Sequence, residues 1–239
     1  MKVVFAKDNP AFPFVFLDAD GTILDFTRSE GVALQQLFLE HGLPFSDEIR
    51  ARYHEINSAL WRGFERGEVD KKDVQRLRFE RLLGSVGRAG DPDAVNARYL
   101  QLLTENVFLV DGAVEACAAL AARATLLLAT NGVQWTQTRR MANSPLAPFF
   151  RFIVTSEEAG AQKPAPGFFT YSLAQCGNPD PSQVLMVGDQ LSTDILGGAD
   201  AGLATCWFNP AGEARPSDAP RIDHEIHHLR ELAPLLDRA

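Results

Sequence analysis

Five short, mostly apolar runs recur along the chain, and small or polar residues follow each of them at once. The first run is 14–17, and the others are 125–129, 152–154, 184–187 and 203–208. Apolar runs of this length are typical of strands that a sheet buries on both faces. We therefore predict five buried strands, each ending in a polar turn.

Helical spacing of apolar residues fills the stretches between the later runs. These stretches are 114–122, 133–142, 168–176 and 193–201. Strands that alternate with helices indicate an α/β fold, in which helices cover both faces of a parallel sheet. Ligands of such sheets bind beyond the carboxyl ends of the strands, and the polar turns lie at those ends.

Residues 26–106 follow a different pattern, with helical periods and no convincing strand. Asp91 and Pro92 form a good helix start, because Asp caps free N–H groups and Pro suits the first helical position. We predict a core domain made of 1–25 and 107–239, interrupted by this helical insertion. One insertion helix should pack against its neighbours through a stripe of side chains, namely Ile49, Tyr53, Ile56 and Leu60.

The length of 239 residues suits one large domain or a core with a smaller insertion. With 46% hydrophobic and 23% charged residues, the composition is that of a folded globular chain and excludes disorder throughout. The formal net charge of −8 has the wrong sign for a protein whose affinity comes from neutralising nucleic-acid phosphates. We expect no nucleic-acid partner, and any bound phosphate must meet a local site.

No apolar run approaches the length of about 18 residues that a membrane span needs, and residues 1–13 show no export signal. We therefore expect no membrane partner. The cysteines are odd in number and far apart, which suggests neither a disulfide framework nor a metal site and is consistent with a reduced cytoplasmic protein. They are Cys117, Cys176 and Cys206.

Asp18 and Asp20 flank Ala19 at the end of the first predicted strand. The two-residue period of a strand starts both side chains toward the same side of the sheet, so two carboxylates share one small site. Asp is also common in turns for local hydrogen bonding alone. For the whole run 18–25, directly after a buried strand, we favour a functional site.

That run resembles the opening signature of the haloacid dehalogenase superfamily, and the three other signatures follow in the family's order. Thr130 at the end of a strand matches the second, Lys163 before Pro164 the third, and 188–194 the fourth. Each would be ordinary alone, as a strand end, a surface lysine or a turn. Together they imply a doubly wound, Rossmann-like core with a helical cap domain inserted after the first strand.

The segment 177–207 is closer still to the house-cleaning pyrimidine 5′-nucleotidases, a subgroup that Asn57 with Leu60 and Trp61 also resembles. Members of this subgroup can carry Glu where this sequence has Gly21, the commoner residue in the wider superfamily. The resemblance implies magnesium-dependent hydrolysis of nucleoside 5′-monophosphates, such as UMP, dUMP and dTMP, to nucleoside and phosphate. We expect a small phosphorylated metabolite, a nucleotide, as the partner, and a monomer or weak homodimer as the assembly.

The leading carboxylates suit hydrolysis of a phosphate monoester in two steps. Asp18 can attack phosphorus to form an aspartyl phosphate, and Asp20 can protonate the leaving oxygen and then deprotonate the attacking water. An ionised carboxylate cluster needs a cation, and Mg²⁺ prefers oxygen ligands. The resemblance implies that Asp18, Asp189 and the Asp20 backbone carbonyl ligate Mg²⁺. It also implies that Asp194 orients either metal-bound water or Lys163.

The other signature residues suit phosphate binding. By the same resemblance, Lys163 should balance the charge of the nucleophile and contact phosphate as a compact cation. The Thr130 hydroxyl and the Asn131 backbone N–H can hold phosphate oxygens at the start of the following helix, where N–H groups point outward.

The helical insertion should act as a lid that excludes water and sets substrate choice. Within it, Trp61 or Phe64 can stack on a base, and Asn57 can hydrogen-bond the edge of that base. Ordinary packing inside the insertion explains all three residues equally well.

Three other functions remain open. The main alternative is a phosphatase for sugar phosphates or other small metabolites, because the same core accepts many substrates through different lids. A dehalogenase needs neither metal nor protonation of the leaving group, so Asp20 and Asp189 argue against it. A non-catalytic regulator would be expected to have lost part of its site, whereas every required position is filled here.

Overall fold

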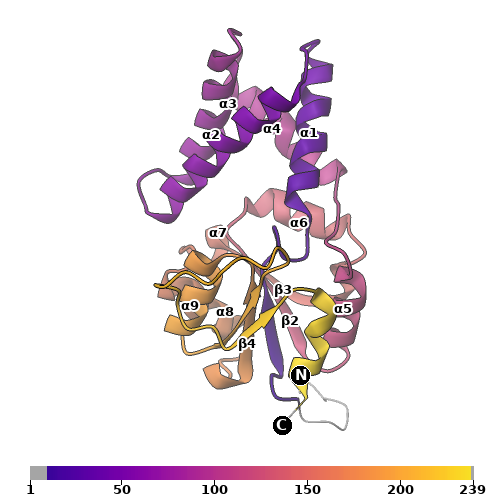
Figure 1. Ribbon diagram of the computed structural model, residues 1–239, viewed down its shortest axis with the longest axis vertical. Helices are drawn as coiled ribbons and strands as arrows, with labels where there is room; N and C mark the ends of the chain where they lie inside the picture. Colours follow the sequence, from indigo (N-terminus) through magenta and orange to yellow (C-terminus); the bar gives the residue numbers. More distant parts are fainter. Residues whose placement is uncertain (1–9, 238–239) are drawn as a thin grey trace. The chain divides into compact units, whose positions relative to one another are not determined.

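The computed structural model describes residues 10–237, so the expectation of no export signal in 1–13 lies mostly outside the described residues. The chain forms two compact units (Figure 1). One contains the described residues up to Phe26 and from Phe108 onward, and the other spans Thr27–Val107.

A parallel sheet forms the centre of the first unit, with the strand order β3-β2-β1-β4-β5-β6. Its strands are β1 (Phe14–Leu17), β2 (Thr125–Thr130), β3 (Phe150–Thr155), β4 (Val184–Gly188), β5 (Ala204–Phe208) and β6 (His224–Ile226). The middle strands are almost wholly buried, because helices cover both faces of the sheet. The predicted α/β fold with a parallel sheet is therefore confirmed.

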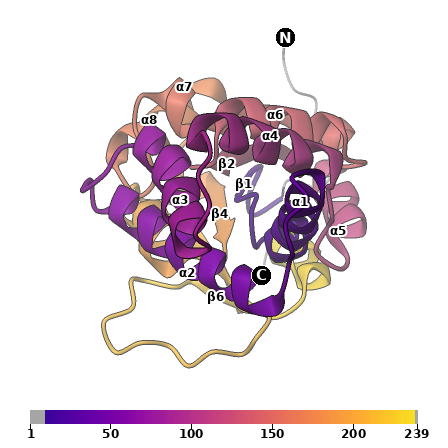
Figure 2. The ribbon, with the colours of Figure 1, turned by 90° about the horizontal axis from the view of Figure 1, so that it is seen from above.

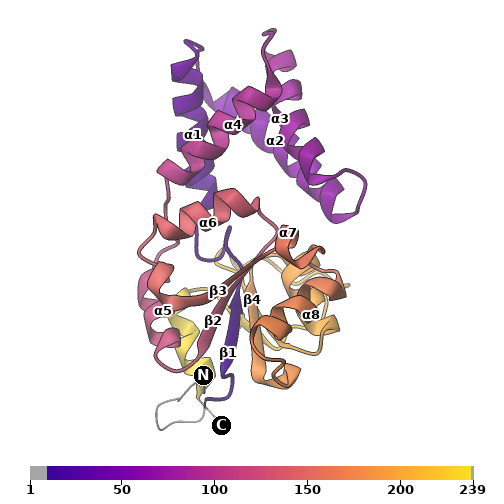
Figure 3. The ribbon, with the colours of Figure 1, turned by 180° about the vertical axis from the view of Figure 1, so that it is seen from behind.

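The helices of the first unit lie on both sides of the sheet, and α5 and α8 are on opposite sides (Figures 1 and 3). They are α5 (Ala113–Ala121), α6 (Gln134–Ala142), α7 (Ser156–Ala159), α8 (Pro166–Gln175) and α9 (Leu196–Asp200). Short 3-10 turns complete the unit: η1 (Ala147–Phe149), η2 (Pro181–Gln183), η4 (Leu229–Glu231) and η5 (Ala233–Leu236). Phe168 and Phe169 of α8 pack with Phe16 and Met186 of the sheet in one buried cluster.

The structure corrects the sequence prediction at three places. The stretch 193–201, predicted as one helix, is a π-helical turn, η3 (Leu191–Ile195), followed by α9. The sequence pattern does not reveal α7 and β6, because elements this short contain too few residues for a period to show. A long exposed connection separates β5 from β6 (Figure 2).

The second unit is helical, as predicted, and contains α1 (Phe26–Glu40), α2 (Asp47–Glu65), α3 (Lys71–Ser85) and α4 (Pro92–Glu105). Asp91 caps α4 by accepting hydrogen bonds from two backbone N–H groups, which confirms the predicted helix start. The rings of Tyr53, Phe79 and Tyr99 pack against one another at the centre, with centroids 5.2–5.6 Å apart. They join α2, α3 and α4 in one core.

Between residues 10 and 237, none of the helices has the length and apolar character that crossing a membrane requires. Cys117 and Cys206 are buried free thiols, and Cys176 is a half-buried one. The prediction that the cysteines form no disulfide framework is therefore confirmed for all three.

Candidate active site

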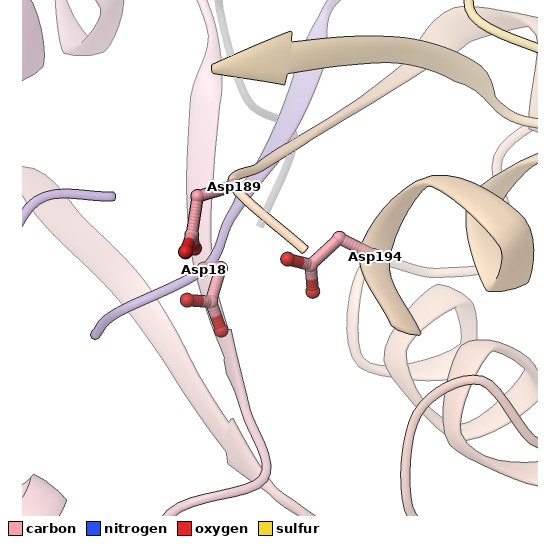
Figure 4. Close-up of side chains that lie close together, drawn as sticks. All are labelled: Asp18, Asp189 and Asp194. Carbon is pink, nitrogen blue, oxygen red and sulfur yellow. The ribbon is translucent and has the colours of Figure 1, made fainter. Parts of the chain in front are cut away.

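Two aspartates lie side by side because they follow two neighbouring strands. Asp18 directly follows β1 and Asp189 directly follows β4, which pairs with β1 in parallel. The backbone N–H of Asp18 donates to the Val187 carbonyl at 2.9 Å and fixes this register. Asp194 reaches the same place from η3 (Figure 4), and one carboxylate oxygen of each aspartate lies within 4.8 Å of the others. The sheet topology thus gathers three carboxylates from distant parts of the chain.

Lys163 is buried beside this cluster and is 2% exposed. Its Nζ donates to Asp18 Oδ1 and Asp194 Oδ1, both at 2.6 Å, and to the Ala129 carbonyl at 2.7 Å. An ammonium group has three N–H donors, so all of them are engaged. This arrangement favours charge balance at Asp18 over direct phosphate contact, and the predicted phosphate contact remains a prediction.

The pKa values reflect charge held away from water. Burial raises the pKa of Asp18 to about 7; Lys163 opposes this shift, and Asp194 adds to it. Burial, reinforced by repulsion from Asp18, raises the pKa of Asp189 to about 6. Burial opposes the charged Lys163 ammonium, but its carboxylate neighbours outweigh that effect and raise its pKa. The cluster therefore holds negative charge that one lysine only partly compensates.

Two glycines let the carboxylates approach the backbone closely. A Cβ atom on Gly188 would collide with the Asp194 carboxylate. Gly21 has φ +89°, which favours glycine, and a Cβ there would lie 2.6 Å from Asp189 Oδ2. Thr22 Oγ1 donates to the other oxygen, Asp189 Oδ1, at 3.1 Å. The Glu that related sequences can carry at the position of Gly21 would require this turn to change shape.

Asp20 is not one of the three clustered carboxylates, and its side chain contacts α6. Its Oδ1 forms an ion pair with Arg140 Nη1, and its Oδ2 accepts a hydrogen bond from Gln137 Nε2. Neither partner was predicted from the sequence. Their only signal is the three-residue spacing that puts Gln137 and Arg140 on one face of a helix, and polar residues at that spacing are ordinary on helix surfaces.

The predicted phosphate-binding residues lie next to this group. Thr130 is the last residue of β2. Its Oγ1 accepts hydrogen bonds from Gly132 N at 3.0 Å and from Gln137 Nε2 at 3.1 Å. The Asn131 side chain pairs with the backbone of Lys163: its Oδ1 accepts from Lys163 N at 2.8 Å, and its Nδ2 donates to Lys163 O at 3.0 Å. Asn131 therefore ties the second signature to the third.

The predicted substrate-selecting residues contact other side chains of the helical unit. The buried Asn57 donates to Glu30 Oε2 at 3.1 Å and accepts from Arg78 Nη1 at 3.5 Å. Trp61 packs edge-on against Phe64, with ring centroids 5.6 Å apart. These contacts do not distinguish base recognition from packing inside the unit, and a role in base recognition stays a prediction for all three.

The carboxylate cluster fits a divalent cation. When Asp18, Asp189 and Asp194 are all ionised, Lys163 neutralises one of their three negative charges, and two remain. The ligands on offer are hard carboxylate oxygens, the donor set that Mg²⁺ prefers. Burial raises the pKa values of Asp18 and Asp189, and repulsion between carboxylates adds to this, so a bound cation would stabilise the ionised forms.

Residues 13–202 match the model of the haloacid dehalogenase-like hydrolases. The chain belongs to this family, which confirms the resemblance seen in its four signatures.

Two relatives of similar length are similar to this chain over nearly its whole length. The pyrimidine 5′-nucleotidase YjjG of Escherichia coli is 36% identical, over 92% of this chain and 96% of its own. The pyrimidine 5′-nucleotidase PynA of Streptococcus pneumoniae is 33% identical, over 95% of this chain and 96% of its own. The expected enzyme class, a phosphoric monoester hydrolase, agrees with these relatives.

A solved structure gives the same fold. The crystal structure of the HAD-hydrolase YfnB of Bacillus subtilis, bound to magnesium, has a TM-score of 0.89 and 36% identity. The match covers 95% of this chain and 99% of that one. Among the residues described here, the cluster of Asp18, Asp189 and Asp194 is the group suited to such an ion.

The raised carboxylate pKa values predict how stability depends on pH when metal is removed. In excess EDTA, the melting temperature should rise as the pH falls from about 8 to about 5. The folded state takes up protons at Asp18 and Asp189 in a range where the unfolded chain does not, so stability is lost as the pH rises through about 6 to 7.

Other groups also titrate in this range, so the control is Asp18→Asn measured in parallel. The variant should be the more stable protein at pH 8, and its advantage should vanish toward pH 5. A difference between the two proteins that does not change with pH would contradict the uncompensated charge at Asp18.

Proposed function

We propose that this enzyme hydrolyses pyrimidine nucleoside 5′-monophosphates to nucleoside and phosphate, with Mg²⁺ as its cofactor. The observation that carries this proposal is the Asp18, Asp189 and Lys163 cluster with Asp20 close by, in a chain similar over its length to two pyrimidine 5′-nucleotidases. Dehalogenation needs neither a metal nor a proton for the leaving group, so Asp20 and Asp189 argue against it, and the filled site disfavours a purely regulatory protein.

In the first step, Asp18 attacks the phosphorus atom. Lys163 holds Oδ1 of Asp18, so Oδ2 is the oxygen available to form the new P–O bond. The bond between phosphorus and the nucleoside 5′-oxygen breaks as Asp20 transfers a proton to that oxygen. The products are the nucleoside and an aspartyl phosphate on Asp18.

In the second step, water attacks the aspartyl phosphate. Asp20 has lost its proton and now accepts one from that water, which makes water the stronger nucleophile. The P–O bond to Asp18 breaks, phosphate leaves, and the carboxylate regains its charge beside Lys163. Because Asp20 ends the cycle protonated, the enzyme is ready for the next substrate.

Phosphate charge needs compensation in both steps. Asp18, Asp189 and the backbone carbonyl of Asp20 would hold Mg²⁺, which supplies positive charge to the phosphate oxygens and the carboxylates. Asp194 holds Lys163 in place through their 2.6 Å ion pair. The Thr130 hydroxyl and the Asn131 N–H would bind phosphate oxygens at the end of β2.

We further propose that the helical unit Thr27–Val107 acts as a cap that selects the organic part of the substrate. Asn57, Trp61 and Phe64 are its candidate base-recognising residues. Asn57 is hydrogen-bonded to Glu30 and Arg78. If Asn57 binds a base, the hydrogen bonds among these three buried side chains would have to rearrange.

A substrate panel tests the proposal. Phosphate release should be measured with UMP, dUMP, dTMP, purine monophosphates and sugar phosphates, each with Mg²⁺ and with EDTA. We expect kcat/KM for the pyrimidine nucleotides to exceed the others by about 10-fold or more, the discrimination that a shaped pocket supplies. EDTA should abolish turnover, and added Mg²⁺ should restore it.

Each other outcome has a definite meaning. A preference for sugar phosphates would replace the nucleotide proposal by the broader phosphatase function. Equal rates with pyrimidine and purine nucleotides would remove the base preference. No phosphate release across the panel would favour a regulatory protein, and turnover in EDTA would overturn the role of Mg²⁺.

A further inference from the structure

Arg140 is a fully buried arginine that no signature includes. It projects from α6, is 1% exposed, and forms an ion pair with Asp20, whose side chain is 29% exposed. Its Nε and Nη2 atoms have no hydrogen-bond partner among the described residues. Burying a guanidinium with unused donors is costly. The one carboxylate that compensates this charge in the described structure is the proposed acid and base.

Gln137, one helical turn earlier, completes the arrangement. Arg140 Nη1 donates to Gln137 Oε1 at 3.0 Å, which fixes the orientation of the amide because its oxygen must face the arginine. The amide nitrogen is therefore directed at Asp20 Oδ2, and it also lies 3.1 Å from Thr130 Oγ1. One side chain thus links the Asp20 carboxylate to the proposed phosphate-binding threonine.

Gly132 makes room for this link. A Cβ atom at Gly132 would overlap the Gln137 side chain, so the glycine after Asn131 is needed for Gln137 to reach both Asp20 and Thr130. The backbone N–H of Gly132 also donates to Thr130 Oγ1. The turn after β2 and the first turns of α6 therefore form one connected polar group around Asp20.

We propose that Arg140 and Gln137 are positioning residues that hold the Asp20 carboxylate in place for proton transfer. This inference rests on the proposed function of Asp20. The two residues bind different oxygens of Asp20. The charged Arg140 pairs with Oδ1, and the neutral amide of Gln137 donates a hydrogen bond to Oδ2.

The hydrogen bonds from Arg140 and Gln137 reach oxygens with different roles in the reaction. The proton that Oδ2 donates to the leaving group uses one lone-pair direction of that oxygen, and the other direction can still accept a hydrogen bond from the Gln137 amide in the first step. Arg140 keeps Oδ1 fixed meanwhile. After the proton has gone to the leaving oxygen, both hydrogen bonds hold the Asp20 carboxylate in place until the attacking water returns a proton.

Two variants separate positioning from folding. Arg140→Met and Gln137→Met keep roughly the length of each side chain and remove its donors. Arg139→Met is the matched control, because Arg139 is the neighbouring arginine of the same helix, is exposed, and stacks on Trp135. Each protein is assayed with UMP and with p-nitrophenyl phosphate, and its melting temperature is recorded.

The leaving group distinguishes the possible roles. A nucleoside alkoxide needs a proton to leave, whereas p-nitrophenolate does not, and kcat/KM covers the steps up to release of this first product. Arg140→Met should lower kcat/KM for UMP by about 30- to 100-fold, as misplacement of a catalytic group does. Gln137→Met should lower it by about 3- to 10-fold. For p-nitrophenyl phosphate the loss should stay below about 5-fold in both variants, and Arg139→Met should match the wild type.

Equal losses with both substrates in a folded variant would overturn the positioning role, as would unchanged kcat/KM for UMP in both variants. If Arg140→Met fails to fold, the ratio between the two substrates in Gln137→Met decides alone. The proposed function fails separately, because a wild type that hydrolyses neither substrate would refute it before any variant is compared.

Discussion

Asp18→Asn should abolish turnover, lowering kcat by about 10⁴-fold or more, as loss of a nucleophile does. The amide cannot form the P–O bond on which the first step depends, and it also removes one proposed ligand of Mg²⁺. Phosphate release from UMP at saturating Mg²⁺ measures the effect. Residual activity within about 100-fold of the wild type would show that another group attacks phosphorus.

The variant should still fold, so that its loss of activity can be assigned to the missing nucleophile. Asn has almost the same volume as Asp, and the carboxylate it replaces is destabilised by burial, as its raised pKa of about 7 shows. Lys163 keeps its ion pair with Asp194 and its hydrogen bond to the Ala129 carbonyl. A melting temperature without Mg²⁺ at or above that of the wild type is the expected control.

Asp20→Asn should lower kcat/KM for UMP by about 10²- to 10⁴-fold, or about 3 to 5 kcal/mol of barrier. The amide cannot give a proton to the nucleoside oxygen. The loss should be much smaller for p-nitrophenyl phosphate, whose leaving group needs no proton. With that substrate kcat should still fall, because the variant cannot deprotonate water, and phosphoenzyme should accumulate.

Comparison with the Arg140 variant adds a quantitative check. Removing Asp20 removes the proton transfer itself, whereas removing Arg140 only misplaces the group, so the Asp20→Asn loss must be the larger. Equal losses of kcat/KM for good and poor leaving groups in Asp20→Asn would contradict the acid role.

The buried strands could be predicted from the sequence because burial on both faces leaves no choice of residue type. The runs around Phe16 and Met186 are apolar without a break, and both strands lie in the middle of the sheet. The three-residue strand β6 at the sheet edge has one buried side chain, Ile226. A single buried residue sets no period, so nothing in the sequence marks that strand.

The clustered carboxylates could be predicted as a group because parallel strands bring their carboxyl ends to one edge. Asp18 and Asp189 are 171 positions apart in the chain yet follow neighbouring strands. The partners of Asp20 could not be predicted in the same way. Gln137 and Arg140 lie on a helix with many polar residues, and only the packing of α6 shows that these two are buried while Arg139 is exposed.

Acid quenching during turnover of UMP labelled in its phosphate, followed by peptide mapping, tests phosphoryl transfer to Asp18 most directly. The label should appear on the peptide that contains Asp18, as an acyl phosphate that hydroxylamine releases, and it should accumulate in Asp20→Asn with p-nitrophenyl phosphate labelled in the same way. Label on another residue, or none on the protein while solvent oxygen enters phosphate in a single displacement, would contradict the account.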